Sequence, residues 1–253
     1  MRTVTAVAHR GDPYRLRENT LPSLRAALEL GADAVEIDVR LTRDGVPVLL
    51  HDASLDRLWE HQRPLASLSA DEVRGLTGGG VPTLEEALRE TAGHRVLVDL
   101  PDATPETART VVGVVADCGA TDRAYYCAGP DAMLALRAAD PDAEIALTWQ
   151  TLAPPRPALL AAIAPRWLNY RFGLVGRELV DRVHAEGLLI SAWTADTRRT
   201  MRRLLAHGVD SITTNRLDVL TAELSRGPRE PRVPREARSS REPRQLPGPR
   251  QLR

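Results

Sequence analysis

Short β-rich runs alternate with amphipathic helical patterns from residue 3 to residue 225, and this alternation restricts the fold more than any other feature. A helix between two strands lets the chain cross back and begin the next strand in the same direction, so repeated βα units predict a parallel sheet. About eight such units in roughly 225 residues fit a closed (β/α)8 barrel of the TIM type. A doubly wound open sheet is the alternative.

The individual elements follow from the spacing of apolar residues. The predicted strands span residues 3–8, 34–41, 47–51, 95–100, 123–127, 144–149, 167–170, 188–193 and 209–213. The predicted helices span residues 20–30, 83–92, 104–117, 131–139, 156–163, 175–186, 197–206 and 216–224. Helix starts are marked by a capping-box pattern at Thr83 and Glu86 and by Pro22 just after Thr20.

One connection between strands leaves no room for a helix. Residues 35–50 read VEIDVRLTRDGVPVLL, two strand runs joined by a polar segment with an Asp-Gly pair. That pair is typical of a type I′ turn, so we expect a β-hairpin between the second and third strands. If Asp44 and Gly45 are the two loop residues, Asp38 lies opposite His51, and a carboxylate faces an imidazole.

Composition predicts one folded unit followed by a tail. A chain of 253 residues that is 43% hydrophobic can bury one sizeable core, and we assign residues 1–225 to the barrel. Residues 226–253 contain nine Arg and three Glu among many prolines. Such a stretch buries too little apolar surface to offset its ordering entropy, so we expect a disordered Arg/Pro-rich C-terminal tail.

Targeting signals and charge restrict the partners. No apolar stretch approaches the ~20 residues of a membrane span, and the first apolar run is too short for a secretion signal. These features predict a cytoplasmic protein without a stable membrane anchor. The excess of basic charge is a property of the tail, and we expect no nucleic-acid partner. No pattern points to a particular oligomeric state.

Polar and apolar residues alternate along the predicted strand 34–41. Glu36 and Asp38 share the polar face, which would lie in water on an open sheet but points inward in a closed barrel. Two carboxylates there are costly unless a cation neutralises them, and carboxylate oxygens are ligands of hard divalent cations. Asp99, near the end of strand 95–100, would complete a three-carboxylate site at the C-terminal mouth of the barrel.

The first predicted strand runs directly into His9 and Arg10, and the return arm of the hairpin ends at His51. An imidazole can pass a proton near neutral pH, and a guanidinium matches two phosphate oxygens. Two imidazoles, a guanidinium and a carboxylate-bound divalent cation suit phosphodiester cleavage. Two His and a carboxylate around iron fit less well, because Gly11 stands where the oxygenase pattern has an acidic residue.

These residues belong to a series of motifs. The motifs are HRG at 9–11, ENT at 18–20, EIDV at 36–39, TRDGVPVLLHD at 42–52, VPTLEEAL at 81–88, WT at 193–194 and GVDSITTN at 208–215. In this order, and across nearly the whole predicted barrel, they resemble the glycerophosphodiester phosphodiesterase family, which is of the PLC-like, TIM-barrel type.

The resemblance implies a TIM-type barrel with Mg²⁺ or Ca²⁺ that hydrolyses glycerophosphodiesters to glycerol 3-phosphate and an alcohol, a reaction of lipid metabolism. It implies the following roles: His9 and His51 as the acid/base pair, Arg10 on the phosphate, Glu18 in the site, and Glu36 and Asp38 as metal ligands, joined by Asp99. Trp193, at the end of a late predicted strand, is expected to form an aromatic wall for the substrate, with a plain core position as the alternative.

Four departures from the family pattern lie at the predicted mouth. In place of the usual Glu-x-Lys this chain has Asp99-Leu100-Pro101, and in place of Ser-Phe it has Cys127-Ala128. The Asn that follows Trp-Thr-Val is replaced by Asp196, and the final Thr-Asp by Thr214-Asn215. A shorter carboxylate can still bind a metal, but the Lys contact to phosphate is missing. The alternatives are therefore a phospholipase D-type enzyme acting on lysophospholipids and a catalytically weak phosphodiester-binding homologue.

Overall fold

The computed structural model describes residues 4–101 and 103–226. Eight parallel strands in these ranges form the sheet: β1 (Thr5–His9), β2 (Ala34–Leu41), β4 (Arg95–Asp99), β5 (Ala124–Ala128), β6 (Ile145–Trp149), β7 (Trp167–Arg171), β8 (Leu189–Trp193) and β9 (Ser211–Thr214). The sheet closes because β1 pairs with β2 on one side and with β9 on the other. The predicted (β/α)8 barrel is therefore confirmed, and the open sheet is excluded.

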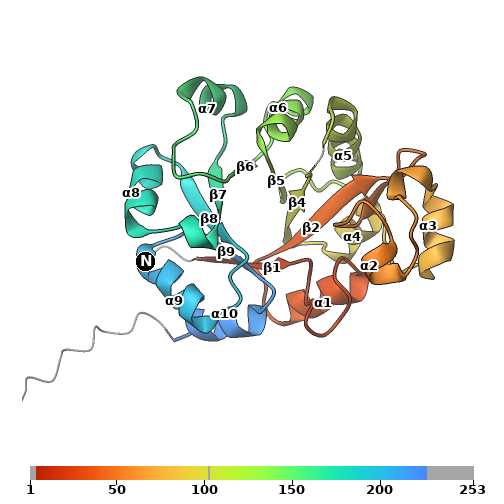
Figure 1. The fold of residues 1–253 in the computed structure, drawn as a ribbon, viewed down its shortest axis with the longest axis horizontal. Helices are drawn as coiled ribbons and strands as arrows, with labels where there is room; N and C mark the ends of the chain where they lie inside the picture. The colour runs from red at the N-terminus through yellow and green to blue at the C-terminus, as the bar shows by residue number, and fades with distance from the viewer. Residues whose placement is uncertain (1–3, 102, 227–253) are drawn as a thin grey trace, which may run out of the picture.

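Helices surround the strands on the outside of the barrel (Figure 1). The eight that follow barrel strands are α1 (Leu21–Glu29), α4 (Leu84–Glu90), α5 (Pro105–Asp117), α6 (Pro130–Ala139), α7 (Pro157–Ile163), α8 (Arg177–Ala185), α9 (Arg198–His207) and α10 (Leu217–Leu224). A short 3₁₀ turn, η2 (Phe172–Leu174), follows β7. The predicted capping box is present, since Thr83 Oγ1 accepts from the Glu86 amide and Glu86 accepts from the Thr83 amide.

The hairpin predicted after β2 is present, with a different loop. β3 (Pro47–Leu49) runs antiparallel to β2. The amide of Thr42 donates to the carbonyl of Val46 at 3.1 Å, which leaves three loop residues, 43–45, rather than two. Gly45 has a φ of +78°, the left-handed residue that ends a three-residue hairpin loop.

The longer loop shifts the predicted pairing by one residue. Val39 pairs with Leu49, and the amide of Leu50 donates to the carbonyl of Asp38 at 3.0 Å. The prediction that Asp38 lies opposite His51 is therefore wrong, because a slip of one residue turns each side chain to the other face. His51 instead follows the strand in a loop.

Between β3 and α4 the chain forms an insertion that the sequence analysis missed. It contains α2 (Asp56–Trp59), the 3₁₀ turn η1 (Leu65–Ser67) and α3 (Ala70–Thr77). The insertion has an apolar cluster of its own: Val48, Leu50, Leu55, Leu65, Leu68, Val73 and Val81. It lies beside β2 and α4 on the outside of the barrel (Figure 1).

The barrel interior has an apolar floor below a polar mouth. The floor consists of inward side chains of one small cluster: Val7, Ala34, Leu97, Tyr125, Ala146 and Trp167. Cys127 belongs to the same cluster but pairs in register with Asp99. Because alternate residues of a strand share a face, Glu36 and Asp38 follow Ala34 inward, and Asp99 follows Leu97. The carboxylates therefore stand above the floor, toward the carboxyl ends of the strands.

Two expectations about the rest of the chain have different outcomes. Within the described ranges, no helix combines the length and apolar character that crossing a membrane requires. The predicted disordered tail, residues 226–253, lies outside the described residues except for Arg226.

Candidate active site

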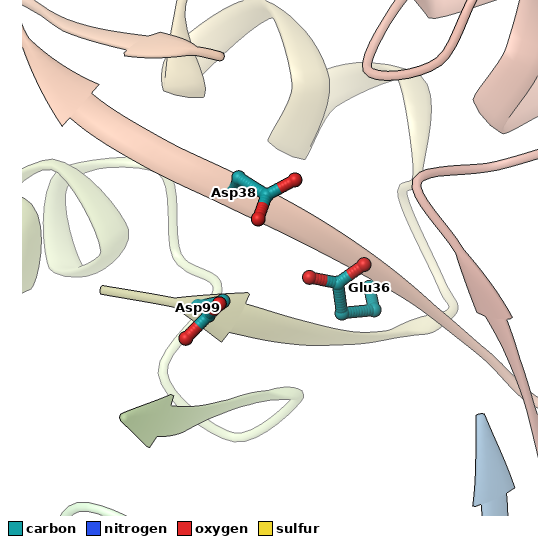
Figure 2. A group of neighbouring side chains, drawn as sticks. All are labelled: Glu36, Asp38 and Asp99. Carbon is teal, nitrogen blue, oxygen red and sulfur yellow. The ribbon is translucent and has the colours of Figure 1, made fainter. Parts of the chain in front are cut away.

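Three carboxylates from two neighbouring strands meet inside the mouth of the barrel. Glu36 and Asp38 are on β2, and Asp99 ends β4 in register with Asp38. One oxygen from each side chain lies within 4.8 Å of the other two, and Figure 2 shows the three carboxylates facing a common space. Glu36 and Asp38 are buried, with exposed fractions of 4% and 0%. The structure thus brings together the three predicted metal ligands.

The cluster carries an excess of buried negative charge. Burial and the neighbouring carboxylates, Asp38 first, raise the pKa of Glu36 well above its usual range. Burial and Asp38 likewise raise the pKa of Asp99 to about 7. Among the described residues, Oδ1 of Asp38 has no hydrogen-bond partner although it is fully buried. Clustered carboxylates with an unpartnered oxygen fit a hard divalent cation, which prefers oxygen ligands.

The raised pKa of Asp99 predicts how pH acts on the metal-free protein. The folded-state pKa, about 7, lies above the unfolded value near 3.8, so the native state binds more protons between these values and stability falls as pH rises from about 4 to about 7. A difference of one pKa unit corresponds to about 1.4 kcal/mol, so the free energy of unfolding falls by at most about 4 kcal/mol over this range. Solvent screening at this partly exposed side chain makes the fall smaller.

Denaturant unfolding in EDTA at pH 4, 5.5 and 7 measures this effect. The free energy of unfolding of Asp99→Asn, relative to wild type, should increase over that range, because the variant lacks the carboxyl group. A difference independent of pH would contradict the assignment of this pKa. Glu85→Gln, an exposed change on α4, serves as the control.

Arg10 follows β1 and lies against the carboxylate cluster. Its Nε lies 2.9 Å from Asp38 Oδ2, its Nη1 donates to Glu18 Oε1 at 2.9 Å, and its amide donates to Glu36 Oε2 at 3.0 Å. The next residue, Gly11, has a φ of +91°, and a Cβ there would meet Ser23 Oγ at 2.3 Å. Only glycine allows the chain to turn at this point and hold Arg10 in the site.

His9 ends β1 beside the same cluster. Its Nε2 lies 3.9 Å from Glu36 Oε2, and its Nδ1 lies 2.8 Å from Asn215 Oδ1. Burial first, and then the positive charge of Arg10, lower the pKa of His9. The neutral imidazole is therefore favoured near pH 7, as a proton acceptor requires.

His51 lies in the loop after β3, with a side chain that is 44% exposed. Its Nδ1 is 2.7 Å from Asp52 Oδ1, and Asp52 Oδ2 accepts from Arg57 Nε at 2.5 Å. Arg57 Nη2 also donates to Glu18 Oε1 at 2.6 Å. Since Glu18 also contacts Arg10, a continuous chain of charged contacts runs from His51 to the guanidinium beside the carboxylates.

Glu18 and Asn19 come from the loop between β1 and α1. Although burial opposes it, contacts from Arg57 and Arg10 lower the pKa of Glu18 and keep this carboxylate charged. Asn19 Nδ2 donates to Asp38 Oδ2 at 2.7 Å, and Asn19 Oδ1 accepts from the Asp38 amide at 3.3 Å. The ENT motif thus both orients one carboxylate of the cluster and supports Arg10.

Trp193 ends β8 at the same mouth of the barrel. Its indole Nε1 is buried, and no hydrogen-bond acceptor for it exists among the described residues. A buried indole N–H normally has a partner, so this unpartnered donor is an exception to the usual pattern. Cys127, one of the four departures, pairs in register with Asp99 between β4 and β5, with Sγ 3.6 Å from Asp99 Oδ1.

Several contacts were missed by the sequence analysis. Asp52 contacts His51 and is itself held by Arg57. Asn215 contacts His9 on one side and Asp196 on the other. The sequence does indicate the contact between His51 and Asp52, because the two residues are adjacent. Arg57 lies only five positions after Asp52. His9 and Asn215 are 206 positions apart, and closure of the barrel brings them together.

Comparisons with known proteins point to one family. The model of the glycerophosphoryl diester phosphodiesterase family matches residues 9–219. The chain is 33% identical to a probable glycerophosphodiester phosphodiesterase 2 of Mycobacterium tuberculosis, over 85% of this chain and 88% of the relative. It is 27% identical to a glycerophosphodiester phosphodiesterase of Caldanaerobacter subterraneus, over 87% and 98% of the two chains.

Solved structures show the same fold. A glycerophosphodiester phosphodiesterase from Parabacteroides distasonis superposes with a TM-score of 0.75 at 26% identity, covering 89% of this chain and 98% of that one. A phosphodiesterase from Oleispira antarctica, solved in complex with sn-glycerol-3-phosphate, superposes with a TM-score of 0.78 at 23% identity, covering 87% and 96%. At that identity the second likeness supports the barrel fold alone.

Proposed function

Because this chain belongs to the glycerophosphoryl diester phosphodiesterase family, we propose that it hydrolyses glycerophosphodiesters to glycerol 3-phosphate and an alcohol, a step of lipid metabolism. One observation carries the proposal: three clustered carboxylates meet beside Arg10 and His9 at the carboxyl ends of the barrel strands, where (β/α)8 enzymes have their active sites. These groups supply what phosphodiester cleavage requires, namely charge neutralisation and proton transfer.

The metal site of this proposal consists of Glu36, Asp38 and Asp99, and we assign it Mg²⁺ or Ca²⁺ from its all-oxygen ligand set. A divalent cation bound there supplies Lewis-acid polarisation of the phosphoryl oxygens. The protein holds these ligands in place through Asn19, which donates to Asp38, and through the Arg10 amide, which donates to Glu36.

Arg10 binds the phosphate group in this account. Two of its donors lie against Glu18 and Asp38, and the planar guanidinium retains further N–H groups for phosphate oxygens. Trp193 ends β8 at the mouth, where its ring provides the expected aromatic wall. Pro101 contributes no cation where the family has Lys, so Arg10 carries more of the phosphate charge.

His9 and His51 transfer the protons. Neutral His9 accepts the proton of the attacking hydroxyl, which comes from water or from the glycerol moiety of the substrate. His51 donates a proton to the leaving oxygen, and the carboxylate of Asp52 lies beside it to balance the charge of the protonated ring. The two imidazoles thus act as base and acid in one step, which avoids an unstable alkoxide leaving group.

One observation favours lysophospholipids as a second substrate class. Large apolar side chains are exposed on loops that follow barrel strands: Tyr14 at 64% and Leu16 at 39% after β1, and Leu152 at 56% after β6. Because these loops border the mouth, they could contact an acyl chain. Cleavage would then occur at the same phosphodiester.

A substrate panel separates the two classes. We expect soluble glycerophosphocholine to give glycerol 3-phosphate and choline, and lysophosphatidylcholine to be cleaved more slowly. If the apolar rim binds acyl chains, Tyr14→Ser with Leu152→Ser should slow cleavage of the lysolipid alone by about 10-fold, whereas Leu134→Ser on α6 should not. Phosphocholine as the product would contradict the proposed bond cleavage.

A further inference from the structure

Asn215 connects His9 to a carboxylate in the next loop of the barrel. Asn215 directly follows β9, and its Oδ1 lies 2.8 Å from His9 Nδ1. On its other side, Asn215 Nδ2 donates to Asp196 Oδ2 at 2.8 Å, and the Asn215 amide donates to Asp196 Oδ1 at 2.8 Å. Thr214 Oγ1 also donates to Asp196 Oδ1, at 3.2 Å. Asp196 is therefore held as an acceptor by three donors.

This arrangement determines which nitrogen of His9 carries the proton. A carboxylate only accepts hydrogen bonds, so the amide nitrogen of Asn215 must face Asp196, and its carbonyl oxygen must face His9. A carbonyl oxygen also only accepts, so His9 Nδ1 must be the donor. In the neutral ring, Nε2 then carries the lone pair, and this nitrogen lies 3.9 Å from Glu36 Oε2.

Two of the departures from the family pattern form this one pair. Asp196 and Asn215 bond to each other, and the amide of the pair, not the carboxylate, faces His9. A neutral group therefore lies against the imidazole. Asn215 thus orients the His9 ring without placing another negative charge in contact with it. The ring already lies beside Glu36 of the carboxylate cluster.

We propose that Asn215 and Asp196 are positioning residues that hold His9 as its Nδ1–H tautomer, with Nε2 free to accept a proton. The inference rests on the proposed function, in which His9 accepts the proton of the nucleophile. Asn215 acts directly on the ring, and Asp196 acts through Asn215 by fixing the orientation of its amide.

Reciprocal substitutions test the pair. Asn215→Asp alone places two carboxylates in contact, and Asp196→Asn alone removes the acceptor that orients the amide. We expect each to lower kcat by about 10- to 100-fold with little change in KM, since misplacing one catalytic group costs rates of this order. The double variant restores a complementary pair and should recover most of the lost kcat. Asp218→Asn, which changes an exposed pair with Arg216, is the control.

A second measurement does not depend on turnover. Long-range ¹H–¹⁵N spectra report the tautomer of His9, with its signals assigned from their loss in His9→Gln. We expect Nδ1–H in the wild type and a mixture of tautomers in Asp196→Asn. An Nε2–H tautomer in the wild type would overturn the proposal, as would full activity in both single variants. An Nδ1–H tautomer in a protein without phosphodiesterase activity would refute the proposed function but support the positioning role.

Discussion

Replacing His51 with alanine should lower kcat for glycerophosphodiester cleavage by at least about 10²-fold and leave the fold intact, because general acid–base catalysis contributes about 10²–10⁴ in rate. The His51 side chain is partly exposed in a loop, so its removal opens no cavity in the core. His9→Ala should lose a similar factor in rate. Its free energy of unfolding should also fall by about 1 kcal/mol, because the half-buried Asn215 Oδ1 loses its hydrogen-bond partner.

Steady-state kinetics together with circular dichroism check this prediction. His94→Ala is the matched control, because His94 is an exposed imidazole before β4, at the opposite end of the barrel from the mouth. Near-full activity in His51→Ala, with an unchanged spectrum, would remove this residue from the mechanism. A folded His9→Ala variant with wild-type turnover would do the same for His9.

Replacing Glu36 with glutamine should abolish the response to divalent cations. Glutamine keeps the shape of the side chain and an acceptor for the Arg10 amide, but it removes one carboxylate from the cluster. We expect a loss of about 10³-fold in activity, equivalent to about 4 kcal/mol of transition-state stabilisation. In EDTA the variant should be at least as stable as wild type, because glutamine is neutral at every pH, whereas burial beside Asp38 and Asp99 raises the pKa of the Glu36 carboxyl group and makes its ionised form unfavourable.

Thermal unfolding with and without the cation gives a readout that needs no substrate. Mg²⁺ or Ca²⁺ at about 100 times its dissociation constant should stabilise the wild type by about 2.7 kcal/mol, and Glu36→Gln by far less. Glu85→Gln, which alters an exposed carboxylate on α4, should respond like the wild type. An equal shift of the melting temperature in wild type and Glu36→Gln would place the cation elsewhere.

The barrel was predictable because its signals are local. Each strand and helix follows from the apolar spacing of its own segment, and the observed bounds agree with the predicted ones within a few residues. The insertion was missed because its helices are short and are held by a separate apolar cluster. Ser69 and Glu72 form a capping box at the start of α3, a signal that was present in the sequence.

The hairpin register failed for a reason of side-chain chemistry. The Asp-Gly pair favours a two-residue loop, but Thr42 Oγ1 donates to Asp44 Oδ1 at 2.6 Å and accepts from the Val46 amide at 3.0 Å. These contacts stabilise a loop that is one residue longer. A pattern based on two loop residues does not include the side chain of Thr42, which decides the pairing here.

The site was predictable in its residues and less so in its contacts. Period-two alternation placed Glu36 and Asp38 on one face, and a closed barrel turned that face inward. The partners of the imidazoles depend on closure itself. Asn215 reaches His9 across 206 positions of sequence because β9 pairs with β1. No local pattern encodes that distance.

Release of glycerol 3-phosphate from glycerophosphocholine by the purified protein tests the central claim most directly. It should be measured with Mg²⁺, with Ca²⁺ and with EDTA, beside His51→Ala. We predict turnover that requires a divalent cation and falls by at least about 10²-fold in the variant. Turnover that persists in EDTA would contradict the metal site. Tight binding of the diester without turnover under either cation would contradict catalysis and identify a phosphodiester-binding homologue.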